Sequence, residues 1–246
     1  MVYLRETDFN NKSIGGVMDK VVVSVGGSIL IPDKDDSSYI RKLSEMLRSI
    51  VTEQHVIVVC GGGKISRYYA NTGRELGGDT YQLDELGIII TRANAGLLRI
   101  ALGDLSVGVI PTEAGKAAEL SSPGKIVVMG GTVPGHTTDA VSAMVAKAWN
   151  ANRIVNATSV DAVYSEDPRK NPDAERYGDM TIDELKNIVY SEHGAGNSSV
   201  FDPLGIQIAK EQQIDIMIVD GRNLSDLKNA ICGKKFQGTT VHSKRV

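Results

Sequence analysis

Cysteine and aromatic residues are scarce in this chain. Its 246 residues include two cysteines, Cys60 and Cys232, which lie far apart and form no CxxC pair. We therefore expect neither a disulfide scaffold nor a structural zinc site, and a reducing cytoplasmic compartment is the simplest location. Aromatic residues make up only 5% of the chain, so no aromatic interface patch can be identified from the sequence.

Long apolar runs and an excess of one charge are also missing. No run approaches the ~18 apolar residues of a membrane helix, so we expect no membrane partner. The formal net charge of -3 gives no general attraction for nucleic acid. With 41% hydrophobic residues the chain is too apolar to be disordered. Residues 1–18 are polar, which excludes a secretory signal and predicts a loosely ordered extension before a single domain over 19–246.

The common nucleotide and hydrolase motifs are absent. The chain has no GxxxxGK(S/T) and no GxGxxG, which excludes a P-loop ATPase and an ordinary dinucleotide-binding domain. HExxH and GxSxG are missing too. Glycine, by contrast, is abundant, with 26 residues and no fixed repeat. Such an excess suggests backbone turns that approach a ligand closely.

Strand and helix patterns alternate along the chain. Short β-branched runs predict buried strands over 21–25, 55–60, 107–110, 126–129, 153–157 and 214–219. Apolar periodicity predicts helices over 39–51, after residue 63, and over 84–102, 112–120 and 139–149. Three more helices begin at the capping box Thr181–Glu184, at Asp202 and at Asn223. This alternation predicts an α/β fold with a mainly parallel sheet covered on both faces.

Glycine turns follow three of the predicted strands. They are Gly26-Gly27-Ser28, which leads into a polar loop, Gly61-Gly62-Gly63-Lys64, and Gly130-Gly131-Thr132. Ligands of such sheets bind at the carboxyl ends of the strands, where these turns would lie together. Lys64 and Arg67 fall in the first turn of a helix, where cations oppose the helix dipole unless an anion lies nearby. The turns therefore predict a phosphate cradle, with tight structural turns as the alternative.

The segment from Gly130 to Asp139 is rich in hydroxyl-bearing residues. Its threonines and the following helix N-terminus suit a phosphate or a pyrimidine edge, and the alternative is a capped turn with Thr138 or Asp139 as N-cap. We interpret His136 as a solvated loop residue, because no other ligand stands at metal-binding spacing.

Two further segments leave alternatives open. Over residues 84–94, Asp84 is a candidate helix cap and Arg92 a candidate structural residue, and the pattern leaves the role of the segment open. Residues 158–167 suit a purine pocket or, preferably, a surface hairpin.

Together these motifs resemble the amino acid kinase family, and within it the archaeal type of uridylate (UMP) kinases. The resemblance runs from Lys20 to Thr240, and it is most specific in GGTVPGHTTDA, GGGKISR and TRANA. It implies a three-layer α/β/α sandwich with an acceptor-binding N-terminal lobe and an ATP-binding C-terminal lobe. It further implies transfer of the ATP γ-phosphate to UMP, Mg²⁺ carried by ATP, no metal site built by the protein alone, and a homohexamer.

The resemblance also assigns site residues. Those implied for ATP are Gly27, Ser28, Gly63, Arg67, Thr158, Ser159, Tyr164 and Asp167. Those implied for UMP are Gly62, Asp84, Thr132, Val133, Pro134, Gly135, His136, Thr137 and Thr138. Arg67, Lys64, Asp139 and Asp202 are the candidates for catalysis. For the two aspartates, helix capping is the alternative role.

One position departs from the family pattern. Many members carry a lysine two residues before the first glycine pair, where Ser24 stands here, and Lys64 is the candidate to supply the missing charge. Ser24 also motivates a different class, a non-catalytic nucleotide- or oxyanion-binding protein on the same fold. Another small-molecule kinase of the family is the nearer alternative, although an isopentenyl phosphate kinase would carry histidine in place of Arg67.

Overall fold

The computed structural model describes residues 18–32, 37–168, 170–193 and 200–244. The polar extension expected over 1–18 lies outside these residues, apart from Met18.

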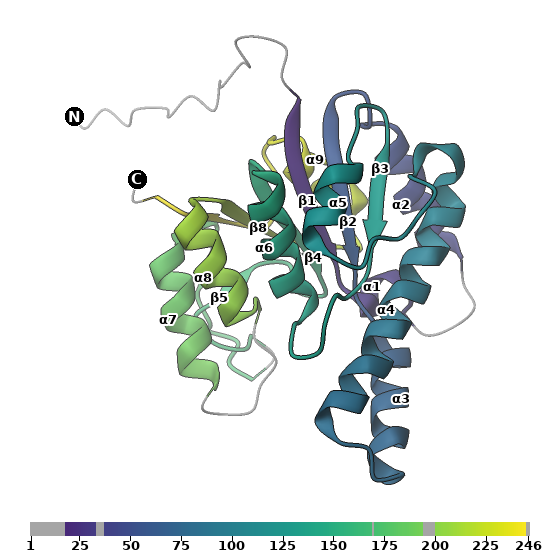
Figure 1. Ribbon diagram of the computed structural model, residues 1–246. Helices are drawn as coiled ribbons and strands as arrows, with labels where there is room; N and C mark the ends of the chain where they lie inside the picture. The colour runs from purple at the N-terminus through teal and green to yellow at the C-terminus, as the bar shows by residue number, and fades with distance from the viewer. Residues whose placement is uncertain (1–17, 33–36, 169, 194–199, 245–246) are drawn as a thin grey trace, which may run out of the picture.

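A mixed sheet forms the centre of the described chain (Figure 1). Its strand order is β3-β2-β1-β4-β8-β9-β7, and β3, β2, β1, β4 and β8 are mutually parallel. β9 pairs antiparallel with β8, and β7 runs parallel to β9. The strands are β1 Asp19–Val25, β2 Gln54–Cys60, β3 Ile126–Met129, β4 Arg153–Thr158, β7 Asp179–Thr181, β8 Asp215–Asp220 and β9 Thr239–His242. A separate hairpin joins β5 Val163–Tyr164 to β6 Arg176–Tyr177.

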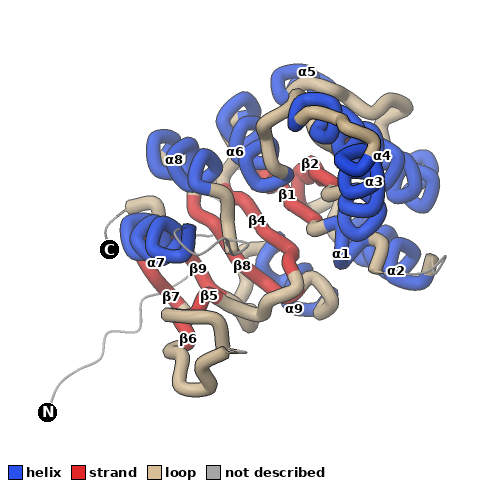
Figure 2. The backbone as a smooth tube through the Cα atoms, turned by 90° about the horizontal axis from the view of Figure 1, so that it is seen from below, coloured by secondary structure: helices blue, strands red, loops and turns tan. Residues whose placement is uncertain are grey.

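Helices cover both faces of this sheet (Figure 2). One face packs against α5 Ala114–Leu120, α6 Thr138–Trp149, α7 Ile182–His193 and α8 Pro203–Gln212. The other face packs against α2 Ser38–Arg48, α4 Thr80–Leu102 and α9 Leu224–Ile231. Alternate strand residues divide between the two cores, with Val22 on the α6 side and Val21 and Val23 on the α2 side. The three-layer α/β/α sandwich is confirmed.

The chain reverses direction across the sheet at β1. From β1 the chain adds β2 and then β3 on one side. It then returns through α6 and adds β4 on the other side of β1. Ligands of open α/β sheets bind at such a switch point, outside the carboxyl ends of the strands. The short helix α1 Gly27–Leu30 and α3 Gly63–Glu75 begin there.

Several local predictions are confirmed. Thr181 and Glu184 form the predicted capping box, and Asp202 and Asn223 cap α8 and α9 with their side chains. The strand predicted over 107–110 is wrong, because only the neighbouring Ser106 makes a single bridge, to Ile126. The sequence also gave no sign of β9, whose partners in β8 and β7 are distant along the chain.

α4 combines an apolar composition with polar contacts. The segment Thr80–Leu105, which contains α4, is long and apolar enough to cross a membrane by length and composition, with a mean hydropathy of 1.3 over 18 residues. Its inner face nevertheless buries Thr91 and Asn94 as well as Ala95 and Leu98 against the sheet layer. Together with α3, its first half extends beyond the sheet in Figure 1.

Candidate active site

The first two glycine turns touch each other backbone to backbone. A Cβ atom on Gly27 would lie 2.1 Å from the amide nitrogen of Gly63, and one on Gly61 would lie 2.6 Å from the nitrogen of Gly27. Gly63 also has a positive φ of 64°. Glycine is therefore required in both turns, because any side chain would push them apart. Ser28 lies in α1, so the polar loop predicted after Gly27 is wrong and the turn leads directly into a helix.

Helix α3 begins within the second glycine turn, and two cationic side chains stand in its first turns. Gly62 is the N-cap of α3 and offers no side-chain acceptor to the first amides of this helix. Lys64 and Arg67 stand exposed in its first turns. Unpaired amides and a positive dipole end make a helix N-terminus a binding place for an anion, and these two cations add to that charge.

The third turn continues into the 130–138 loop, which is tied to α4. The amide of Gly135 donates to Asp84 Oδ2 at 2.8 Å, so Asp84 lies within α4 as a loop anchor, while Asp79 caps this helix. Buried polar atoms of the loop, Thr132 Oγ1 and His136 Nδ1, have no hydrogen-bond partner in the described chain. The interpretation of His136 as simply solvated is wrong at this nitrogen. Orphaned buried polar atoms are costly, so a ligand that paired with these two would be stabilising.

The C-terminal part of the loop starts α6. Thr137, rather than the predicted Thr138 or Asp139, is the N-cap, and its Oγ1 accepts from the Ala140 amide at 3.2 Å. The same hydroxyl donates to Asp202 Oδ2 at 2.8 Å. Thr138 Oγ1 lies next to Gly61, while Val133 is half exposed and Pro134 partly buried on the loop.

Two carboxylates flank the start of α6. Ser24, only 1% exposed near the end of β1, donates its hydroxyl to Asp139 Oδ1 at 3.0 Å. Burial raises the pKa of Asp139 to about 7, the charge of Asp202 raises it further, and the Ser24 hydrogen bond opposes the shift. Asp202 Oδ1 accepts from the amide of Leu204 as the cap of α8. Asp202 therefore caps α8, as the capping alternative predicted, whereas Asp139 lies inside the first turn of α6 and caps no helix.

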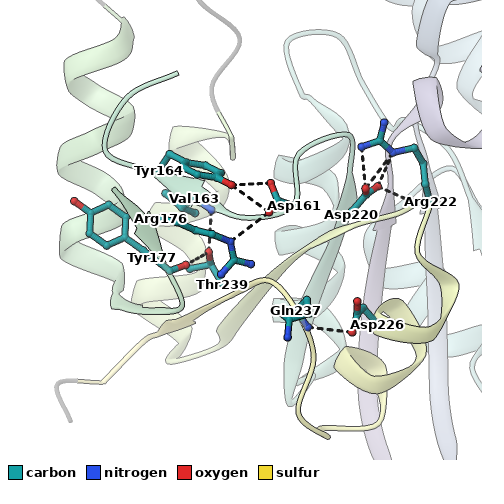
Figure 3. Close-up of polar contacts among 10 residues, drawn as sticks. All are labelled: Asp161, Val163, Tyr164, Arg176, Tyr177, Asp220, Arg222, Asp226, Gln237 and Thr239. Atoms are coloured by element: carbon teal, nitrogen blue, oxygen red, sulfur yellow. Dashed lines mark hydrogen bonds and ion pairs between the residues drawn. The ribbon is translucent and has the colours of Figure 1, made fainter. Parts of the chain in front are cut away.

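The hairpin predicted over residues 158–167 begins there with β5, but its second strand, β6, lies at Arg176–Tyr177, beyond the predicted range (Figure 3). Tyr164 donates its hydroxyl to Asp161 at 3.0 Å, and Arg176 Nε donates to the same carboxylate at 3.3 Å. Burial, followed by the Asp161 carboxylate, raises the pKa of Tyr164. The buried Thr239 Oγ1 accepts from the Val163 amide at 2.8 Å and ties the hairpin to β9.

The remaining residues of this group lie at the ends of β4 and β8. Thr158 ends β4, and Ser159 accepts at its carbonyl oxygen from Arg222 Nη2 at 3.2 Å. Arg222 also pairs with Asp220, the last residue of β8. Asp167 follows in the turn after β5, where its carbonyl oxygen accepts from two amides. Sequence reasoning did not single out Arg176 or Arg222, because only folding brings them beside Asp161 and Ser159, whereas Asp161 stands three residues before Tyr164 and could have been found from the sequence.

No group of three or more His, Cys, Asp or Glu side chains that could hold a metal gathers within the described residues. Mg²⁺ is commonly held by one or two carboxylates together with phosphate oxygens of a substrate.

Comparison with known proteins agrees with this geometry. Residues 19–220 match the model of the amino acid kinase family. A uridylate kinase of Methanobrevibacter smithii is 41% identical over 92% of this chain and 100% of its own length. One of Methanococcoides burtonii is 43% identical over 92% and 97%. The crystal structure of uridylate kinase from Archaeoglobus fulgidus superposes with a TM-score of 0.82 at 37% identity, covering 91% of this chain and 100% of that one. This chain belongs to the amino acid kinase family.

Proposed function

We propose that this protein is a UMP kinase, which transfers the γ-phosphate of ATP to UMP and yields UDP and ADP in pyrimidine nucleotide biosynthesis. The observation that carries the proposal is the 130–138 loop, with its orphaned Thr132 and His136 atoms, beside two interlocked glycine turns. The uridylate kinase names of relatives about 40% identical along nearly the whole chain support the same reaction.

The acceptor and donor are assigned to two lobes that share the sheet. UMP would lie against Gly62, Asp84 and the 130–138 loop. ATP would place its phosphates at Gly27, Ser28, Gly63 and Arg67, and its base and ribose near Thr158, Ser159, Tyr164 and Asp167. The turns after β1, β2 and β3 and the end of β4 lie at the carboxyl ends of neighbouring strands, and we propose that the γ-phosphate and the acceptor phosphate face each other there.

The chemistry demands positioning and positive charge more than a base. A phosphate monoester has a second pKa of about 6, so the attacking oxygen of UMP is already anionic at neutral pH. Phosphoryl transfer then depends on in-line alignment and on stabilising the charge of the equatorial oxygens. Arg67 and Lys64, at the start of α3, are the residues that we assign to this charge.

The residues present fit a magnesium ion that arrives with ATP. Asp139 and Asp202 are two carboxylates at the start of α6 and α8, and the raised pKa of Asp139 marks a site where a cation would be stabilising. Mg²⁺ prefers one or two carboxylates together with phosphate oxygens. Bound there, it would neutralise developing charge on the transferred group. Ser24, being neutral, leaves this task to the ion and to Lys64.

We further propose a homo-oligomer, a homohexamer by family resemblance, in the cytoplasm. Large apolar side chains stand exposed on α3, on α4 and in the turn between them: Ile65, Tyr68, Tyr69, Leu76, Tyr81, Ile89, Leu97 and Ile100. Such a face suits burial against another copy of the chain. The free cysteines Cys60 and Cys232 suit a reducing compartment. Light scattering coupled to size exclusion measures the assembly, and a monomer would contradict the oligomer.

The test of the reaction is ADP release from Mg-ATP with a panel of acceptors: UMP, CMP, dTMP, AMP, acetylglutamate, aspartate and isopentenyl phosphate. Turnover on UMP alone is expected. Turnover on another acceptor would assign a different kinase of the family. ATP binding without turnover on any acceptor would favour the alternative of a non-catalytic nucleotide-binding protein, which the replacement of the family lysine by Ser24 suggested.

A further inference from the structure

α4 carries polar side chains that point at the loops of the site rather than at solvent. In the sequence they belong to the segment 84–94, whose role the pattern left open. Asn94 Nδ2 donates to the carbonyl oxygen of Gly61 at 2.8 Å. Thr91 Oγ1 accepts from the amide of Gly131 at 2.7 Å and donates to the Ile88 carbonyl at 2.6 Å. One turn of α4 therefore contacts both the second and the third glycine turn.

Arg92 makes the most specific of these contacts. Its Nε donates to the Gly131 carbonyl at 3.1 Å, and its Nη2 donates to the Thr132 carbonyl at 2.9 Å. The planar guanidinium thus binds two successive carbonyl groups, which fixes the orientation of both peptides. The approach is close, because a Cβ atom on Gly130 would lie 2.6 Å from the Arg92 amide nitrogen.

The peptide that Arg92 holds belongs to a residue with an orphaned hydroxyl. Thr132 Oγ1 is buried and has no partner in the described chain. The direction of this hydroxyl depends on the orientation of its own backbone, which Arg92 and Thr91 hold. Asp84 fixes the loop again at Gly135, 51 residues away along the chain. Both ends of the segment 131–135 are therefore attached to one helix.

We propose that Arg92 is a positioning residue for the acceptor, acting through Thr132. It holds the 130–138 loop so that the Thr132 hydroxyl and its neighbours meet a pyrimidine nucleotide in one fixed arrangement. Arg92 itself binds backbone carbonyls and not the substrate. This inference rests on the proposed function, since it assigns the loop to UMP.

A merely structural role would weaken the whole protein, whereas a positioning role weakens acceptor binding selectively. Arg92→Met keeps the length of the side chain and removes both donors, and Arg92→Lys retains a charge that can reach one carbonyl. Arg99→Met is the matched control. Arg99 lies on the same helix, is also partly buried, and donates to a backbone carbonyl, that of Gly108, at 2.6 Å, away from the glycine turns.

The measurements are kcat and KM for UMP and for ATP, and UMP affinity by calorimetry. We expect Arg92→Met to raise KM and Kd for UMP about tenfold or more, to change KM for ATP less than about twofold, and to reduce the preference for UMP over CMP. Arg92→Lys should fall between, and Arg99→Met should match the wild type. A UMP affinity within about twofold of wild type in Arg92→Met, or equal losses for UMP and ATP, would overturn the inference.

A double-mutant cycle keeps the test decisive if Arg92→Met does not fold. Arg92→Lys and Thr132→Val are combined, and the Kd of UMP is measured for each variant. Because both act through the same hydroxyl, we expect the combined loss to be smaller than the product of the two single losses, and independent losses would refute the coupling. If the wild type phosphorylates UMP but the two single losses in UMP affinity multiply in the double variant, only this inference is refuted. If the wild type is inactive on UMP, the proposed function is refuted together with this inference.

Discussion

The substitution Asp139→Asn tests the electrostatics at the centre of the site. In the metal-free protein, burial next to β1 and the charge of Asp202 raise the pKa of this carboxyl from 3.8 to about 7. The folded state therefore holds a proton that the unfolded chain releases between these two values. Stability is greatest below the lower pKa and is lost as the pH rises through the higher one.

The size of the effect follows from the shift. The full displacement corresponds to an upper bound of about 4 kcal/mol in the free energy of unfolding, and roughly 2–3 kcal/mol of it falls between pH 5 and pH 8. Asparagine has nearly the same shape and does not titrate. Relative to wild type, Asp139→Asn should therefore gain about 2–3 kcal/mol of stability when the pH is raised from 5 to 8.

The assay is urea unfolding of wild type and variant in EDTA at pH 5, 6, 7 and 8. The quantity compared is the difference in free energy of unfolding at each pH, which cancels the titration of other groups. Ser24→Ala is the matched control, since loss of its hydrogen bond to the ionised carboxylate should steepen the pH dependence. If the difference between Asp139→Asn and wild type stays constant from pH 5 to pH 8, the carboxyl does not titrate in this range and the reasoning is wrong.

Three further substitutions test the site. Asp84→Ala should raise KM for UMP about tenfold and leave KM for ATP unchanged, because it removes the acceptor that holds the 130–138 loop at Gly135; steady-state kinetics with each substrate varied would expose an equal effect on both. Arg67→Ala should lower kcat about 100-fold in single-turnover assays, and a normal rate would remove it from the charge-stabilising groups. Gly27→Ala should abolish ATP binding in calorimetry, since its Cβ would lie 2.1 Å from the Gly63 nitrogen, whereas Gly26→Ala, with its nearest atom at 3.4 Å, should still bind; binding by both would contradict the interlocked turns.

Local patterns were enough to predict much of the fold. β1, β2 and β4 are buried on both faces, so their sequences contain β-branched runs. Such runs predict strands without knowledge of their partners. Helix starts at Thr181 and Asp202 depend on side chains within three residues of the cap, and the sequence contains them directly. The three glycine turns lie at strand ends for the same local reason.

Contacts between distant segments were not accessible in this way. The strand β9 exists because Thr239–His242 finds an open edge of β8, and nothing within the segment itself required that pairing. Thr137 caps α6 in preference to its neighbours while also binding Asp202, a residue of another helix. Local propensity pointed to Thr138 or Asp139 and missed Thr137.

The sequence by itself determined the alternation of strands and helices, the glycine turns and their family resemblance, because periodicity and backbone freedom are properties of neighbouring residues. Only the tertiary structure decided that Ser24 pairs with Asp139, that the Asp139 pKa rises to about 7, and that Arg92 holds the carbonyls of Gly131 and Thr132. Desolvation and hydrogen-bond geometry depend on which distant groups surround an atom, and those neighbours are fixed only when the two cores pack around the sheet.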